Sequence, residues 1–160
     1  MHHSHGLLLW RERAGAIEVL LGHMGGPYWA RRDAGAWTIP KGLAESGDTN
    51  PTATAEREFR EELGQPAPPS DPTHPDLDLG SHRASGKEIH VIARWGDLDP
   101  GAATGGTFTM EWPPKSGRAQ EFPEVDRAAW MGTADARVAL AGNQRVFLDR
   151  LLDALTIGNG

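Results

Sequence analysis

The sequence predicts an α/β protein in which a mixed β-sheet lies between helices, an α/β/α sandwich. Segments typical of β-strands occur in both halves of the chain, and a helical segment follows each half. The length of 160 residues is usual for one domain, which buries roughly two-thirds of the surface of its unfolded chain. We therefore expect a single domain over residues 1–160.

The first half predicts a β-hairpin followed by a short strand. The apolar runs GLLLW (6–10) and AIEVLL (16–21) flank the turn-like RERAG, and the second run alternates so that its apolar residues share one face. After a long loop, WTIP (37–40) predicts a short strand before the small polar residues of KGLAESGDTN (41–50).

The opening segment MHHSH places three histidines together. A metal site is one interpretation of such a group. Terminal histidine clusters are more often part of a frayed end, so residues 1–5 are predicted to form a disordered tail outside the fold.

The first helix is predicted from about Pro51 to Leu63. Proline suits the first helical turn because its missing N–H would be unpaired there, and Asn50 or Thr49 is a suitable N-cap. Gly64 is expected to end the helix, since glycine readily takes the left-handed conformation found at helix C-termini.

The second half begins with five prolines between residues 65 and 76, which favour a surface loop over an interdomain linker. LDLG (77–80) is a possible short strand, whereas EIHVIARW (88–95) and TFTMEW (107–112) alternate as half-buried strands do. A polar loop is expected over 113–129. The last helix is predicted over about 143–155, with a stripe of leucines for the core.

Composition excludes several classes of protein. The absence of cysteine excludes disulfides, thiolate zinc sites and a thiol nucleophile, and it fits a reducing compartment. A formal net charge of −6 argues against a nucleic-acid partner, which would favour a basic face. No apolar run approaches the length of a membrane span. We expect a cytoplasmic protein without a membrane partner, and the sequence specifies no oligomeric state.

The charged segment REFREELG (57–64) contains the main candidate site. On a helix, Glu58, Glu61 and Glu62 share one face at spacings of ~5–6 Å, and Arg57 reaches toward Glu61. A solvated helix surface is the common interpretation of such a run. Three carboxylates this close also repel one another unless cations lie among them, and Mg²⁺ prefers oxygen ligands.

A family pattern joins this segment to the preceding loop. From Gly42 the chain reads G-x5-D, then eight residues, then REFREELGQ, which resembles the Nudix box G-x5-E-x7-R-E-U-x-E-E-x-G-U, where U is apolar. The lead-in WTIPKG is similar to the strand and turn before that box. Three positions differ: Asp48 replaces glutamate, one extra residue precedes Arg57, and Gln65 replaces an apolar residue. The resemblance implies a Nudix-like α/β/α sandwich and a Nudix hydrolase.

The resemblance also implies roles for individual residues. Glu58, Glu61 and Glu62, with the carbonyl of Gly42, would hold Mg²⁺ or, as the alternative, Mn²⁺; Arg57 would orient a glutamate. The metal would neutralise a diphosphate and activate a water, with Glu58 as an alternative general base.

Family members often add a carboxylate from outside the box. The candidates here are Glu121, as a further metal ligand, and Glu124, as a catalytic residue, with Glu111 behind them. Glu124 is favoured by its position six residues before Trp130.

Four residues are candidates for binding a nucleotide substrate. Tyr28, Trp29 and Arg32 would stack a base and grip phosphates, although both aromatic residues are equally suited to packing their loop onto the sheet. Lys41 lies next to the predicted metal shell. We expect a nucleoside polyphosphate substrate, with dinucleoside polyphosphates such as diadenosine tetraphosphate favoured. Nucleoside triphosphates, other nucleoside-diphosphate-X compounds and a non-catalytic nucleotide-binding module are the alternatives.

Overall fold

The computed structural model describes residues 2–101 and 105–158. In chain order its elements are β1 (His2–Arg13), β2 (Ala16–Met24), β3 (Trp37–Thr38), β4 (Lys41–Leu43), α1 (Pro51–Leu63), β5 (Leu77–Ala84), β6 (Lys87–Trp95), β7 (Thr107–Glu111), β8 (Ala119–Pro123), β9 (Val125–Gly132), α2 (Thr133–Ala139), a 3₁₀ turn (Gly142–Gln144) and α3 (Arg145–Gly158). The predicted first hairpin and the strands at 37–40, 77–80, 88–95 and 107–112 are confirmed as strands.

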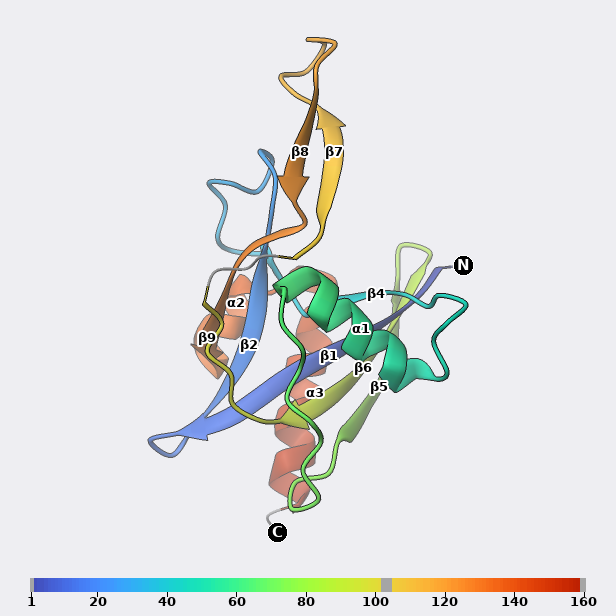
Figure 1. Cartoon of the computed structure of the whole chain (residues 1–160). Helices are drawn as coiled ribbons and strands as arrows, with labels where there is room; N and C mark the ends of the chain where they lie inside the picture. Colours follow the sequence, from blue (N-terminus) through green and yellow to red (C-terminus); the bar gives the residue numbers. More distant parts are fainter. Residues whose placement is uncertain (1, 102–104, 159–160) are drawn as a thin grey trace.

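Strand β1 organises the main sheet (Figure 1). The sheet follows the order β3-β2-β1-β6-β5, with β4 also pairing to β1 and β9 to β2. Strand β1 runs antiparallel to β2 and β4 but parallel to β6, so the sheet is mixed. This confirms the sheet type that the sequence predicts.

Helices cover the sheet on both faces, as expected for the sandwich (Figure 1). Leu7 and Leu9 point to the face under α1, where they meet Phe59, whereas Leu8 points to the opposite face and packs in one cluster with Phe147 of α3. The run GLLLW is therefore continuously apolar because both faces of β1 are buried.

The segment 113–129 differs from its prediction as a polar loop. It contains β8 and the start of β9, and β8 pairs with β7 in a separate two-stranded hairpin that projects from the main sheet (Figure 1). Strand β8 is exposed along most of its length, so its side chains lack the apolar alternation that would have indicated a strand. Helix α2 was also not predicted.

The prediction of a disordered tail at residues 1–5 is wrong for residues 2–5, which belong to β1. His3 lies opposite Glu88 and His5 opposite His90 in the parallel β1–β6 pair, while β4 pairs with the other edge of β1 at His5 and Gly42. Backbone hydrogen bonding on two sides gives this end an ordered place in the sheet.

The proline-rich segment 65–76 is held to the rest of the fold by a buried arginine. Nη1 of Arg94 donates to Oε2 of Glu56 in α1 at 2.8 Å and to the carbonyl of Pro68 at 3.2 Å, while Nη2 donates to Oδ2 of Asp76 at 2.8 Å. The segment thus lies against β6 and α1. Among the described residues, no helix is long and apolar enough to cross a membrane.

Candidate metal and active site

Helix α1 has the predicted bounds because local chemistry fixes both ends. The N–H of Ala53 donates to Oδ1 of Asn50 at 2.8 Å, Pro51 occupies the first turn, and Gly64 has a φ of 77° with its N–H bonded to the carbonyl of Arg60. The buried residues of the helix, among them Phe59, lie against the sheet. This burial fixes the rotation of α1 and therefore the direction of its acidic side chains.

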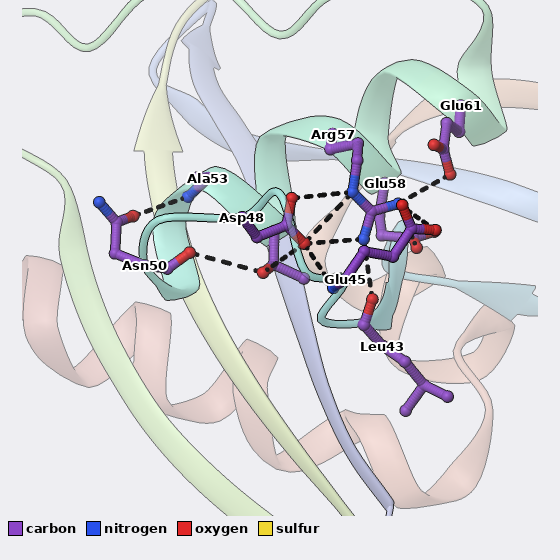
Figure 2. A network of polar contacts seen from close by, with 9 residues as sticks. Leu43, Glu45, Asp48, Asn50, Ala53, Arg57, Glu58 and Glu61 are labelled. Carbon is purple, nitrogen blue, oxygen red and sulfur yellow. Dashed lines mark hydrogen bonds and ion pairs between the residues drawn. The ribbon is translucent and has the colours of Figure 1, made fainter.

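Arg57 is the centre of a polar network that joins α1 to the loop before it (Figure 2). Its Nη1 donates to Oε1 of Glu58 at 2.9 Å and to Oε2 of Glu61 at 3.0 Å, while Nη2 donates to the carbonyl of Leu43 at 2.8 Å. Nε and Nη2 both reach the carboxylate of Asp48. The guanidinium therefore orients two of the three candidate glutamates and also fixes the loop.

Asp48 holds this loop although its side chain is one carbon shorter than glutamate. Only 8% of the side chain is exposed. Its carboxylate accepts from the N–H of Glu45 at 2.8 Å and from the hydroxyl of Thr54 at 3.0 Å, in addition to Arg57. These hydrogen bonds, with Arg57 the strongest, hold the pKa of Asp48 well below its usual range. All observed partners of Asp48 are loop or helix groups, which fits an orienting role.

Gly42 and Glu58 are in direct contact. A Cβ added at Gly42 would lie 2.1 Å from the carboxyl carbon of Glu58, so only glycine leaves room for this carboxylate against β4. Burial raises the pKa of Glu58, and the hydrogen bond from Arg57 opposes that effect.

Glu62 is the most strongly perturbed acid of the site. It is half-buried, and its Oε2 accepts from the backbone N–H of Lys41 at 3.3 Å. Burial raises the pKa of Glu62 to about 8; the charges of Glu58 and Glu124 add to this, and Lys41 partly offsets it. A carboxylate in this position is favoured when positive charge lies beside it.

The structure brings Glu124 to the helix and leaves Glu121 in the hairpin. The N–H of Glu124 donates to the carbonyl of Gly106 at 3.0 Å, and the N–H of Gly106 donates in turn to the carbonyl of Glu61. The charge of Glu124 acts on both Glu58 and Glu62. Glu121 is exposed on β8, where its carboxylate accepts from the hydroxyl of Thr107.

The candidate substrate residues fall into two groups. Lys41 lies in β4, beside Glu62. In the loop between β2 and β3, the guanidinium of Arg32 lies 4.2 Å from the ring centroid of Tyr28, which is 60% exposed and contacts Trp29 edge to face. Trp29 packs against the core, so it anchors the loop and leaves Tyr28 and Arg32 on the surface.

His23 is a supporting residue that the sequence analysis did not identify. Its fully buried ring lies between Oδ1 of Asp126, 2.9 Å from Nδ1, and the carbonyl of Arg32, 2.7 Å from Nε2. It therefore ties the loop that carries Tyr28 and Arg32 to β9. Because Asp126 is 103 residues away in sequence, no local pattern indicated this contact.

The residues at this site have the chemistry to hold a hard divalent cation. Oxygen donors are available from the carboxylates of Glu58 and Glu62 and from the carbonyl of Gly42. Because Gly42 has no side chain, the carboxylate of Glu58 fits against β4. Over residues 2–101 and 105–158, no three acidic or histidine side chains converge as one metal shell. Arg57 instead draws Glu58 and Glu61 to one of its nitrogens, and the Glu61 side chain, which is 50% exposed, has room to rotate.

Comparison with known proteins shows one family. The family model of the NUDIX domain matches residues 2–151. An Ap4A hydrolase from C. elegans, solved as a binary complex, has 21% sequence identity and a TM-score of 0.58, with 98% of each chain covered. The NUDIX domain of NrtR from Shewanella oneidensis, solved with ADP ribose, has 15% identity and a TM-score of 0.60, covering 97% of this chain and 88% of that one. A mutT/nudix family protein from Listeria innocua has 15% identity and a TM-score of 0.60, covering 98% and 95%. No curated protein sequence matches the chain.

Proposed function

The chain belongs to the NUDIX domain family and is a hydrolase of that family, and from this premise we propose that it cleaves a diphosphate linkage in a nucleoside polyphosphate with the help of a divalent metal ion. The observation that carries the proposal is the burial of Glu62 beside Lys41 of β4, where burial, with the charges of Glu58 and Glu124, raises the pKa of Glu62 to about 8. A divalent cation beside Glu62 would favour its ionised form.

The proposed metal shell consists of Glu58, Glu61 and Glu62 with the carbonyl of Gly42. A divalent ion held there would supply positive charge for the diphosphate and would lower the pKa of an attacking water. Mg²⁺ is the favoured ion because every proposed ligand is a hard oxygen donor, and Mn²⁺ is the second candidate.

The remaining residues act by position and charge. Arg57 holds Glu58 and Glu61 in place and joins them to the loop at Asp48. The raised pKa of Glu58 suits a carboxylate that accepts a proton from water, which is its alternative role. We assign Glu124 as the additional catalytic carboxylate, because its charge acts on Glu58 and Glu62. Glu121, whose carboxylate accepts from the hydroxyl of Thr107, is the less favoured candidate, as a further metal ligand.

For the substrate, we favour dinucleoside polyphosphates such as diadenosine tetraphosphate. Tyr28 and Arg32 form an exposed aromatic–cation pair suited to a nucleotide base and phosphates, and Lys41 is placed to contact a phosphate near the carboxylates. The C. elegans neighbour, an Ap4A hydrolase, supports this choice only through its fold. The net charge of −6 favours a small nucleotide over a nucleic-acid partner.

The proposal is tested by separating and quantifying the nucleotide products formed from a panel of substrates with Mg²⁺ or Mn²⁺, for example by anion-exchange chromatography. The panel contains dinucleoside polyphosphates, nucleoside triphosphates, nucleotide sugars and ADP-ribose, and the Glu61→Gln variant is the control for contaminating activity. We expect turnover of a nucleoside polyphosphate that depends on the metal and is lost in the variant. If the protein bound a nucleotide but hydrolysed no compound of the panel, it would instead be a non-catalytic binding module.

A further inference from the structure

Two histidines face each other across the parallel β1–β6 pair, near the N-terminal end of β1. His5 lies directly opposite His90, and their Nδ1 atoms are 3.4 Å apart. Both residues are half-buried. The hydrolase site described above uses neither imidazole.

A carboxylate fixes the tautomer of one ring. Nε2 of His90 lies 2.7 Å from Oδ1 of Asp78, a distance at which Nε2–H donates to the carboxylate. In a neutral His90 this contact places the proton on Nε2 and leaves the lone pair on Nδ1, the ring atom that lies 3.4 Å from Nδ1 of His5. Metal-binding histidines commonly have this arrangement, in which the second ring nitrogen donates to a carboxylate.

The distance between Nδ1 of His5 and Nδ1 of His90 distinguishes a hydrogen bond from two ligands of one metal ion. A good hydrogen bond from a ring N–H spans about 2.7–3.2 Å, so 3.4 Å is long for a bond between the rings. Two imidazole nitrogens that bind one tetrahedral Zn²⁺ at about 2.0–2.1 Å are about 3.3–3.4 Å apart. The observed spacing thus fits two ligands of one ion better than it fits a donor and an acceptor.

We propose that His5 and His90 form a second metal site, in which both Nδ1 atoms bind one divalent transition-metal ion such as Zn²⁺ and Asp78 orients His90 from behind. Solvent completes the shell, since within the described residues no third acidic or histidine side chain joins the pair as a ligand. Nitrogen donors select borderline ions, whereas the carboxylates on α1 suit Mg²⁺, so the two sites would differ in the metal that they take. The proposal does not depend on the hydrolase activity.

The test is a Zn²⁺ titration of the full chain in excess Mg²⁺, which occupies the carboxylate site. Affinity is measured by competition with a chromogenic chelator. We expect one Zn²⁺ per chain, at least about tenfold weaker binding in His5→Ala and His90→Ala, and about 10–100-fold weaker binding in Asp78→Asn. The matched control is His82→Ala on the neighbouring strand β5, which should bind like the parent protein.

The imidazole ¹⁵N resonances distinguish ligands from merely structural residues. On addition of Zn²⁺, Nδ1 of His5 and Nδ1 of His90 should shift while His82 stays unchanged. His5→Gln and His90→Gln provide second variants in case either alanine variant fails to fold. An unchanged Zn²⁺ affinity in folded His5 and His90 variants, or an equal loss in His82→Ala, would overturn the proposal.

Discussion

Arg57 and Asp48 make a two-point contact between helix α1 and the loop before it, with Nε 3.0 Å from Oδ1 and Nη2 3.0 Å from Oδ2 (Figure 2). Asparagine in place of Asp48 keeps the shape but removes the charge that holds the guanidinium. We expect Asp48→Asn to lower kcat by up to about 100-fold, because Arg57 would no longer orient Glu58 and Glu61. Steady-state kinetics against the exposed control Asp153→Asn test this, and equal kinetics in the two variants would argue against the orienting role.

Removing one carboxylate charge from α1 should abolish most of the activity and leave the fold intact. We expect Glu58→Gln and Glu61→Gln to reduce kcat at least about 100-fold, since each removes a proposed metal ligand. Glu12→Gln on the exposed end of β1 is the control. Circular dichroism verifies folding, and an unaffected rate in Glu61→Gln would refute its place in the metal shell.

The close contact at Gly42 predicts a strong effect of a single methyl group. In Gly42→Ala the new Cβ would lie too close to the carboxylate of Glu58, which would have to move away from β4. We expect a folded protein with weaker Mg²⁺ binding and at least about 100-fold lower kcat. A Cβ at Gly47 meets no atom within 4 Å, so Gly47→Ala should retain activity. Calorimetric Mg²⁺ titrations of both variants compare the two positions.

The raised pKa of Glu62 predicts how stability depends on pH without metal. A carboxyl whose pKa is raised on folding stabilises the folded state below its ordinary value of 4.5, and this contribution is lost as the pH rises toward about 8. In EDTA we therefore expect a lower Tm at pH 8.5 than at pH 5.5, with a smaller difference in Glu62→Gln. Saturating Mg²⁺ should reduce the difference in the parent protein. The same pH dependence in both proteins would count against Glu62 as its source.

Glu124 and Glu121 are predicted to differ in function although they are three residues apart. The charge of Glu124 acts on Glu58 and Glu62, whereas Glu121 bonds to Thr107 within the hairpin. We expect Glu124→Gln to lower kcat at least about tenfold and to shift the pH profile of kcat, because it alters the charge around the other carboxylates. Glu121→Gln serves as the matched control and should behave like the parent protein.

Local chemistry explains which parts of the structure were predictable. Helix α1 was predicted with its observed bounds because Asn50, Pro51 and Gly64 each act within one turn of their own position. The hairpin of β1 and β2 was equally clear, since its apolar runs flank a short turn. In both cases the pattern and the structure depend on neighbouring residues.

Contacts between distant segments explain the rest. The position of Glu124 depends on backbone bonds that link it to Gly106 and, through that residue, to Glu61. The pairing of His5 with His90 spans 85 residues and arises from a parallel strand pair, for which no short sequence pattern exists. The exposed strand β8 gave no apolar alternation. These features follow from tertiary packing, which a single sequence read locally does not specify.

The hairpin of β7 and β8 projects from the main sheet and yet leads directly into Glu124 (Figure 1). Within the described residues, its side chains belong to neither core cluster. Insertions or substitutions in it would therefore cost little folding stability while changing the surroundings of the carboxylates. Among related chains we therefore expect the length and composition of this hairpin to vary more than those of the main sheet.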